Sequence, residues 1–425
     1  MKRAVVVGSG AGGAAAASGL AGRFAVTVLE AGREFRPFGA GFGIVDAAKR
    51  AGLLFDVREI GLMFPAMKAF KADEGMVLVK GRGTGGTTTI ATGNGLRLDQ
   101  DLKEIGVDLD EEFDRLEREV PITTAHRSRW SRMTRALFEA CGGMGLEPMA
   151  MPKMGRYEGC AMCGRCVLGC PRGIKWDSRE ILAPALEGGV TLRTGVTAER
   201  VVIKGGEAVG LDVRAGLRRE FVPADLVVLA AGGFGTPALL ERSEIPCAPR
   251  LFVDPVLCVA ARWKGARQDR DLPMPFYVRR EGYILAPYFD PLSYFFNREW
   301  RPPAGDILSL MIKLADEPEG RVEGRRVSKP LTAGDANRLA DASDLCRKIF
   351  DRIGVREEDL FFGTLNAGHP GGSLPLGTET AASLHDPRLP GNLYVADATL
   401  LPRALGAPPI LTIMALARKV ARLCV

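Results

Sequence analysis

Short apolar runs separated by glycine-rich turns dominate the first 30 residues of the chain. The apolar run at residues 3–7 predicts a buried strand, the alanine-rich stretch that follows predicts a helix to about Leu20, and residues 26–29 predict a second strand ending at Glu30. A strand, a glycine turn, a helix and a second strand in so short a segment are typical of a βαβ unit. We therefore expect the amino terminus to begin a parallel α/β sheet.

Similar patterns recur farther along the chain. Residues 225–246 predict a buried strand, a glycine turn and a helix. Apolar residues at helical spacing predict helices from Leu109 to Val120, from Met133 to Cys141, and from about Asp335 to Phe350. Residues 274–300 alternate in the manner of strands and are rich in aromatic residues, including Phe276, Tyr283, Tyr288, Tyr294 and Phe296.

The composition is that of a folded globular protein. Apolar residues make up 46% and charged residues 25% of the 425 positions, which excludes disordered, collagen-like and coiled-coil chains. The formal net charge is only +6, and the sequence has no block of five like charges, so no nucleic-acid partner is expected.

The amino terminus resembles a secretory signal, but its glycines argue against one. Gly8, Gly10 and Gly13 interrupt the stretch that would have to be most apolar, and a further apolar strand follows directly. No other stretch offers about 18 uninterrupted apolar residues. We therefore expect a cytoplasmic protein without a transmembrane segment.

The first glycine turn is a candidate dinucleotide site. Gly8 permits a tight turn, Gly10 lets a pyrophosphate approach the backbone, and Gly13 allows the helix to pack closely on the strand. The helix, which starts at Ala11, directs its amino terminus at the phosphates, and Glu30 is placed to bind the adenosine ribose. This pattern alone does not separate FAD from NAD.

Three later segments, together with this turn, resemble the glucose-methanol-choline (GMC) family of FAD-dependent oxidoreductases. The segments are GRGTGGTTTIATGNGLR at 81–97, DLVVLAAGGFGTPALLERSEIP at 225–246, and the carboxyl-terminal run that begins GNLYVADATLLPR. The resemblance runs from Gly8 to about Arg422 and is strong in these four blocks. It implies bound FAD, a small-molecule substrate, and removal of hydride from an alcohol carbon.

The resemblance also implies an α/β fold with a discontinuous domain structure. Residues 1–100, 175–250 and 361–425 would form a Rossmann-like FAD-binding domain. Residues 101–174 and 251–360 would form an α+β substrate or cap domain built on an antiparallel sheet, part of which is the aromatic segment at 274–300.

Further flavin-binding residues follow from the same resemblance. Gly85, Gly86 and Thr87 match the loop that lies along the flavin, and Asp397 matches an acid beside the pyrophosphate and ribityl chain, although a plain turn or cap aspartate is the alternative. A helix that starts near Pro409 and Ile410 would direct its positive end at the flavin ring.

His369 is the candidate catalytic base. Its segment, NAGHPGGSLPLG, is similar to the His-x-x-Gly segment that supplies the base in the family, whereas a loop histidine that caps a glycine turn is the alternative. The family's second polar residue falls on Pro408, which can neither donate nor accept a proton. Of the other histidines, His126 is expected at the surface and His385 in a turn.

The cysteines are clustered in one segment. Cys160, Cys163, Cys166 and Cys170, which is followed by Pro171, have the spacing of a bacterial ferredoxin run and predict a [4Fe-4S] cluster. Such a cluster would take all four thiols, or three of them and a distant cysteine. Zinc, disulfides and thiols without a metal, as in relatives with a related cysteine-rich segment before Gly-x-Lys, are the alternatives.

These observations predict an FAD-dependent dehydrogenase of a hydroxylated or activated carbon. Its electrons would pass through the iron-sulphur cluster to a redox protein or a quinone acceptor. One alternative is an FAD and iron-sulphur reductase of a carbon–carbon double bond, which Pro408 favours. Another is an electron-transfer subunit without a substrate of its own.

Overall fold

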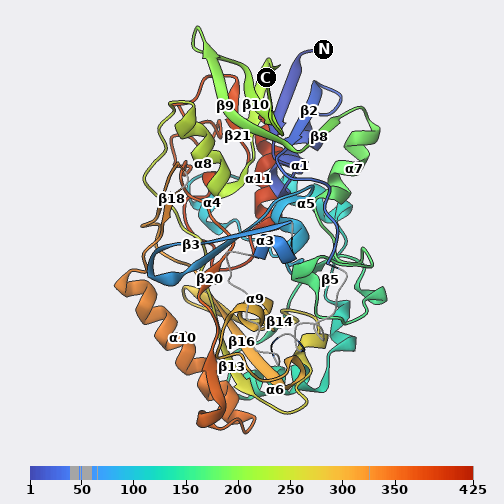
Figure 1. The fold of residues 1–425 in the computed structure, drawn as a ribbon, viewed down its shortest axis with the longest axis vertical. Coiled ribbons are helices and arrows are strands. Elements are labelled where there is room, and N and C mark those ends of the chain that lie inside the picture. Colours follow the sequence, from blue (N-terminus) through green and yellow to red (C-terminus); the bar gives the residue numbers. More distant parts are fainter. Residues whose placement is uncertain (39–46, 48, 50–59, 65, 325, 425) are drawn as a thin grey trace.

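A computed structural model of the chain describes residues 1–38, 47, 49, 60–64, 66–324 and 326–424. The described chain forms an elongated body with one sheet region at each end, and both termini lie at the same end (Figure 1). Within these residues no helix combines the length and the apolar character needed to span a bilayer.

The predicted βαβ unit is present at the amino terminus. It consists of β1 (Arg3–Val7), α1 (Ala11–Leu20) and β2 (Ala25–Glu30). Strand β1 pairs in parallel with β2 and with β12 (Leu226–Leu229), and β8 (Thr191–Thr194) and β21 (Leu393–Val395) complete the sheet. Among the described residues the strand order is β21-β12-β1-β2-β8, so segments from distant parts of the sequence form one parallel sheet.

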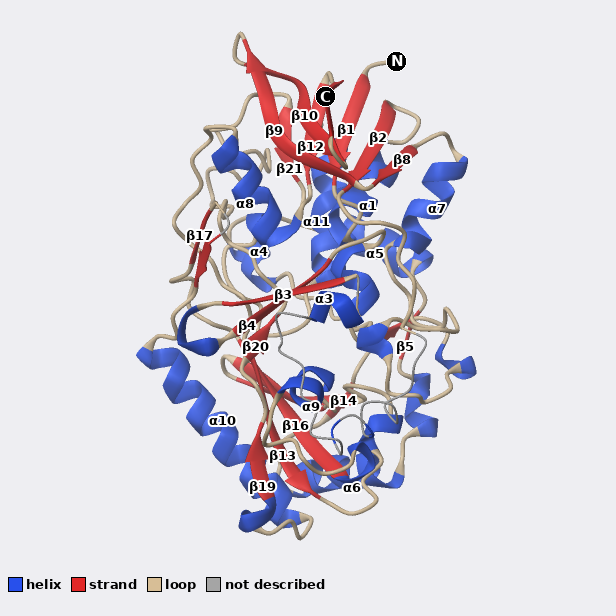
Figure 2. Ribbon diagram, in the orientation of Figure 1, coloured by secondary structure: helices blue, strands red, loops and turns tan. Residues whose placement is uncertain are grey.

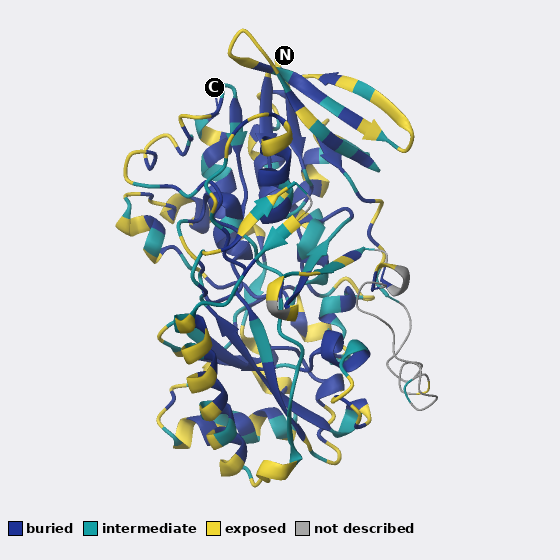
Figure 3. Cartoon of the chain, turned by 60° about the vertical axis from the view of Figure 1, so that its left-hand side comes forward, coloured by how far each residue is buried: buried dark blue, intermediate teal, exposed yellow. Residues whose placement is uncertain are grey.

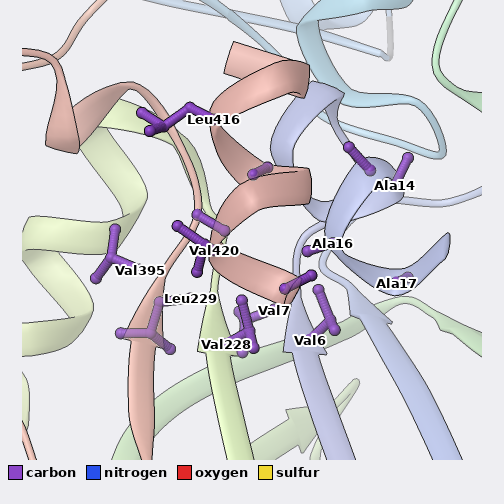
Figure 4. Close-up of a cluster of buried hydrophobic side chains, with 14 of the residues drawn as sticks. Val6, Val7, Ala14, Ala16, Ala17, Val228, Leu229, Val395, Leu416 and Val420 are labelled. Atoms are coloured by element: carbon purple, nitrogen blue, oxygen red, sulfur yellow. The ribbon is translucent and has the colours of Figure 1, made fainter. Parts of the chain in front are cut away.

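Apolar packing between helices and strands holds this sheet region together. Helix α1 packs beside α11 (Ile410–Leu423), and a Cβ placed on Gly19 would lie 2.9 Å from the Cβ of Ala421. Figure 4 shows buried valines, leucines and alanines from both helices and from β1, β12 and β21 meeting in this core. Helices α5 (Asp110–Glu119), α7 (Arg179–Glu187) and α8 (Gly232–Arg242) add to it, with α4 (Gln100–Glu104) alongside.

An antiparallel sheet lies beside the parallel one at the same end of the molecule (Figure 2). It is formed by β9 (Val196–Lys204), β10 (Glu207–Ala215) and β11 (Arg218–Pro223). Two short ribbons occur elsewhere, β5 (Ile122–Thr123) with β7 (Lys153–Met154) and β17 (Arg321–Glu323) with β18 (Arg326–Ser328).

A larger mixed sheet forms the other end. Its strands are β3 (Met67–Lys71), β4 (Val77–Gly81), β20 (Asn366–Ala367), β13 (Val256–Arg262), β16 (Ile307–Leu314), β15 (Tyr283–Pro287), β14 (Phe276–Arg280), β6 (Met149–Ala150) and β19 (Leu360–Phe362). All neighbours are antiparallel except β4 and β20, which pair in parallel. Helices α6 (Arg132–Gly143) and α10 (Ala333–Arg352) cover one face, while α3 (Ile60–Met63) and α9 (Pro291–Phe296) belong to the core on the other. Figure 3 shows the exposed outer side of α10.

The strand prediction for residues 274–300 is correct only in its first part. Strands β14 and β15 are antiparallel neighbours, but Tyr294 and Phe296 lie in α9. Asp290 caps this helix by accepting hydrogen bonds from the backbone N–H groups of Leu292 and Ser293, and Pro291 starts it. This cap and proline override the alternating pattern.

The two sheet regions exchange segments along the chain. Strands β3, β4 and β20 come from residues assigned above to the FAD-binding domain, yet they pair in the mixed sheet. Helices α4 and α5, assigned to the cap, contribute Leu102, Phe113 and Leu116 to the core of the parallel sheet. The domain boundaries given above therefore remain a prediction.

Candidate active site

The first glycine turn requires glycine at three of its positions, of which Gly12 would place a Cβ 1.8 Å from the carbonyl oxygen of Ala396. Gly8 has a φ of +103°, and a Cβ there would lie 2.3 Å from the carbonyl oxygen of Ala230. A Cβ on Gly13 would lie 1.9 Å from the carbonyl oxygen of Gly8. A Cβ on Gly10 would meet its nearest neighbour, the Cα of Gly86, at 3.9 Å. Gly10 therefore has open space beside it, as a bound pyrophosphate would require.

The second glycine loop lies directly against the first. Gly85 donates its backbone N–H to the hydroxyl of Ser9 at 3.1 Å, and a Cβ on Gly86 would lie 2.9 Å from the Cα of Gly10. Thr87, in the 3₁₀ turn Gly86–Ile90, accepts a hydrogen bond from the N–H of Gly81. The two loops form one continuous backbone surface that fits an extended dinucleotide, because peptide N–H groups that no side chain covers can donate hydrogen bonds to phosphate oxygens.

Glu30 is at the end of β2, where the ribose-binding acid is expected. Its carboxylate accepts hydrogen bonds from the hydroxyl of Ser9 at 2.7 Å and from the backbone N–H of Gly32 at 2.7 Å. The oxygen that bonds to Ser9 also accepts the backbone N–H of Ser9 at 3.2 Å, whereas the oxygen that bonds to Gly32 keeps a further lone pair, so a ribose contact is compatible with these bonds.

Asp397 is buried between two turns. Its carboxylate accepts hydrogen bonds from the hydroxyl of Thr236 at 2.6 Å, the N–H of Gly232 at 2.8 Å and the hydroxyl of Thr399 at 2.8 Å. Burial raises the pKa of Asp397 above its ordinary value, although these hydrogen bonds oppose the shift. In this structure Asp397 caps neighbouring backbone, and a contact with the ribityl chain remains a prediction.

The amino terminus of α11 borders a cavity that we call the main cavity. Pro409 is the cap residue of this helix, and Pro408, Ile410 and Thr87 line the cavity. Its other polar walls come from Thr92, Asn94, Tyr288, Asp290, Lys313, Asn366 and His369. The apolar walls come from side chains such as Ile60, Phe64, Met67, Val79, Ile90, Leu168, Val256, Leu292, Phe295 and Met311. An apolar cavity with few polar groups, bordered by a helix amino terminus, suits a flavin ring and a small substrate.

His369 faces this cavity beside a buried carboxylate. The Nδ1 of His369 lies 3.4 Å from the Oδ2 of Asp254, which is an ion-pair distance rather than a formed hydrogen bond. Burial and the nearby Lys313 lower the pKa of His369, and Asp254 acts in the opposite direction. Such an imidazole is neutral at neutral pH and able to accept a proton.

Asp254 is itself paired with Lys313. The Nζ of Lys313 lies 3.1 Å from the same Oδ2, and the two side chains are 2% and 1% exposed. Burial alone would raise the pKa of Asp254, but Lys313 and His369 hold it below its ordinary value. The sequence analysis missed both residues; the one available sign was a single lysine inside the otherwise uncharged run ILSLMIKL at 307–314.

A second buried pair fixes the backbone at Asp254. The carboxylate of Asp316 accepts the N–H groups of Val253, at 3.1 Å, and Asp254, at 2.7 Å. The Nζ of Lys329 lies 3.1 Å from Asp316, and both side chains are fully buried. These contacts fix the backbone position of Asp254 and hence the position of its carboxylate relative to His369.

The four clustered cysteines line a second cavity, which we call the cysteine cavity. Its walls include Cys160, Cys163, Cys166, Cys170, Tyr157, Lys175 and Pro273. All nine cysteines of the sequence lie in the described part of the chain and are free thiols. Burial raises the pKa of Cys160, and it raises that of Cys166 to about 12. The buried hydroxyl of Tyr157 has no hydrogen-bond partner among the described residues.

The donor set separates the candidate occupants of the cysteine cavity. A single zinc ion needs its ligand sulfurs about 2.3 Å from one point. In the described ranges, no group of three or more His, Cys, Asp or Glu side chains is placed so that it could hold a metal ion. A four-iron cluster spreads its thiolates over a larger volume, so thiols arranged around one cavity are compatible with it.

The prediction that His126 lies at the surface is wrong. Its side chain is 1% exposed, its Nε2 lies 2.8 Å from the carbonyl oxygen of Met151, and the indole N–H of Trp130 contacts its Nδ1 at 3.0 Å. The arginines and serines around it are exposed while the ring points inward. His385, which was expected in a turn, lies in the irregular segment between two turns, and its Nε2 contacts the carbonyl oxygens of Pro390 and Leu393.

Comparisons with known proteins agree on the family and the fold. A GMC oxidoreductase family model matches residues 3–256. The chain is 29% identical to an uncharacterized protein of Methanocaldococcus jannaschii over 47% of this chain, and the alignment spans 53% of that protein. It is 27% identical to an uncharacterized GMC-type oxidoreductase of Mycobacterium tuberculosis over 98% of this chain and 75% of the relative. The crystal structure of pyridoxine 4-oxidase from Mesorbium loti has a similar fold, with a TM-score of 0.73, 20% identity and 99% coverage of both chains.

Proposed function

Because the chain belongs to the GMC oxidoreductase family of FAD-dependent oxidoreductases, we propose that it is a dehydrogenase that removes hydride from a hydroxylated or activated carbon of a small molecule. The observation that carries this proposal is the position of His369. It lines the same cavity as Thr87 of the second glycine loop and Ile410 at the start of α11, and a buried carboxylate lies beside its ring.

The chain offers a continuous set of contacts for FAD. The turn from Gly8 to Gly13, including Gly10 and Ala11, would hold the pyrophosphate, and Glu30 would bind the adenosine ribose. Gly85, Gly86 and Thr87 would lie along the ring system, with Asp397 near the ribityl chain. The amino terminus of α11, at Pro409 and Ile410, would stabilise negative charge on the ring. Bound FAD supplies the hydride acceptor.

The protein residues would then orient the substrate and take its proton. With Nδ1 directed at Asp254, His369 has Nε2 left to accept the proton of a substrate hydroxyl. Its lowered pKa keeps the ring in the neutral form that can act as a base. Pro408 lines the cavity but cannot exchange a proton, so His369 acts without a second base from this position.

We also propose that Cys160, Cys163, Cys166 and Cys170 bind a [4Fe-4S] cluster. Their common cavity, their spacing and the unpartnered hydroxyl of Tyr157 support this assignment. When bound, such a cluster supplies a one-electron carrier toward a redox protein or quinone. Because the electrons would pass to such an acceptor in place of oxygen, the protein would be a dehydrogenase.

The test has two parts. Anaerobically purified protein is analysed for flavin, iron and sulphide, and the analysis is repeated on Cys166→Ser and on Cys346→Ser, which removes a buried thiol of α10 far along the chain from the cluster segment. We expect iron in the wild type and in Cys346→Ser but not in Cys166→Ser. Iron-free wild-type protein would exclude the cluster and leave the flavin assignment standing.

The second part identifies the reaction. Flavin-loaded protein is titrated without oxygen against a panel of alcohols that includes pyridoxine, and the chemically reduced protein is titrated against unsaturated acceptors. Reduction by an alcohol supports the dehydrogenase. Oxidation by the unsaturated acceptors alone would favour the reductase of carbon–carbon double bonds, for which Pro408 is the motivating residue. Response to neither, with reversible redox chemistry, would indicate an electron-transfer subunit.

A further inference from the structure

Buried lysines fall into two classes in this molecule. Among the described residues, four lysines are no more than 3% exposed. Lys313 and Lys329 each form an ion pair with a buried aspartate, Asp254 and Asp316. Lys153 and Lys175 form no ion pair within the described ranges. Burial lowers the pKa of both, that of Lys153 to about 7, and the charge of Asp177 opposes the shift at Lys175. A buried ammonium group without an ion-pair partner is costly, so the second class requires an explanation.

The contacts of Lys153 place it in the wall between the two cavities. Its Nζ donates hydrogen bonds to the carbonyl oxygen of Thr92 at 3.2 Å and to the side chain of Asn94 at 2.5 Å, and both residues line the main cavity. Its third bond, at 2.6 Å, goes to the carbonyl oxygen of Pro273, which lines the cysteine cavity. All three partners are neutral.

Lys175 occupies an equivalent position. It lines the cysteine cavity, and its Nζ donates to the carbonyl oxygens of Thr88 and Thr89 at 2.8 and 2.9 Å. These two residues belong to the turn Gly86–Ile90, whose members Thr87 and Ile90 line the main cavity. Both lysines therefore bond to residues on the main-cavity side, and both lie close enough to Cys166 for its charge to act on their pKa.

We infer that Lys153 and Lys175 are the counter-charges of an anionic iron-sulphur cluster in the cysteine cavity, and that they raise its reduction potential. The inference rests on the cluster assigned in the proposed function. A [4Fe-4S] cluster with four thiolate ligands has a net charge of about −2 in its oxidised state, which two ammonium groups balance. An added electron is stabilised by nearby positive charge in a medium of low dielectric constant.

The test compares neutral and charged replacements in the holoprotein. Lys153→Met and Lys175→Met remove a charge, Lys153→Arg and Lys175→Arg keep it, and Lys264→Met, an exposed site, is the control. Each variant is analysed for flavin, iron and sulphide, and its cluster is titrated potentiometrically with detection by electron paramagnetic resonance. We expect each Met variant to lower the equilibrium constant for reduction of the cluster at least tenfold. For one electron this corresponds to a fall of about 59 mV in the reduction potential. The Arg variants and the control should stay near the wild type.

Two outcomes support the inference and one overturns it. A lowered reduction potential in the Met variants supports the inference. Loss of iron from flavin-loaded Met variants also supports it, provided that the Arg variants retain their iron. Met variants with wild-type iron content and wild-type potential overturn it, whereas iron-free wild type is the separate failure of the cluster assignment. If Lys153→Met does not fold, Lys153→Gln retains a hydrogen-bond donor without the charge, and the same prediction applies to it.

Discussion

The carboxylate of Asp254 lies 3.4 Å from the Nδ1 of His369. The two residues are far apart in the sequence and meet because Asn366 of β20 pairs opposite Val256 of β13, and the N–H of His369 donates to the carbonyl oxygen of Val253 at 3.3 Å. The two side chains form no hydrogen bond at this distance, and Lys313, which also lies opposite Val256, holds the same carboxylate oxygen. The arrangement orients a neutral imidazole toward the main cavity.

Replacement of His369 by Ala should slow the reaction without releasing the flavin. General-base catalysis contributes about 10²–10⁴-fold, so we expect a decrease of that order in the rate of flavin reduction. Stopped-flow absorbance in a single anaerobic turnover measures this rate with any alcohol that reduces the wild type. His385→Ala, at a histidine that does not line the main cavity, is the matched control and should react at the wild-type rate. Equal rates for His369→Ala and the wild type would remove His369 from the mechanism.

Breaking the pair between Asp254 and Lys313 should destabilise the fold. Asp254→Asn or Lys313→Met leaves one buried charge without its partner, at a cost of about 3–5 kcal/mol in the free energy of unfolding. The double variant removes both charges and should recover most of this loss. Urea unfolding followed by tryptophan fluorescence gives the three values. Additive losses in the double variant would show that the two charges do not interact.

Asp290 should make stability depend on pH in mildly acidic solution. Burial raises its pKa to about 6 from an ordinary value of 3.8. The folded chain therefore binds this proton more tightly than the unfolded chain, and the stabilisation present below pH 4 is lost as the pH rises through 6. Asp290→Asn keeps the cap oxygen but has no charge. It should gain roughly 2 kcal/mol relative to the wild type between pH 4 and pH 8.

Urea unfolding of both proteins at several pH values in that window measures the difference. Asp316, whose pKa burial also raises to about 6, is unchanged in both proteins and contributes equally. A constant difference across the window would show that Asp290 does not titrate there.

Two glycines with positive φ should respond differently to alanine. Gly8→Ala places a Cβ 2.3 Å from a carbonyl oxygen, whereas Gly22, with a φ of +80°, has no atom within 4 Å of that position. Gly22→Ala should cost about 1 kcal/mol of stability through backbone strain alone. Gly8→Ala should cost more and should also lose bound flavin. Thermal unfolding measures the backbone strain, and the flavin content after purification measures loss of the site. Normal flavin content in Gly8→Ala would contradict the proposal that this turn binds the pyrophosphate.

The sequence predicted the parallel sheet region well because each of its elements has a local pattern. The run at 3–7, the glycine turn and the alanine-rich helix agree with β1 and α1, and the helix expected near Pro409 begins at Ile410. Apolar periodicity and glycine positions are properties of neighbouring residues, so a short window contains the information.

The residues around His369 could not be found in the same way. Asp254 and Lys313 meet only through strand pairing between segments that no local pattern connects. The polar neighbours of His126 in THRSRW predict a surface position, although its own ring is buried. The alternating pattern around Tyr294 and Phe296 predicts a strand, whereas the cap at Asp290 starts a helix there. In each case tertiary contacts or a local helix cap determine the position of the residue, and the pattern of its sequence neighbours does not.

The most direct test of the central claim is the visible spectrum of the protein, loaded with FAD and mixed with alcohols in the absence of oxygen. The account predicts that the protein binds the flavin, that at least one alcohol bleaches its absorbance bands, and that His369→Ala binds equally but bleaches far more slowly. Folded protein that cannot be reconstituted with FAD, or flavin that no alcohol reduces, would contradict it.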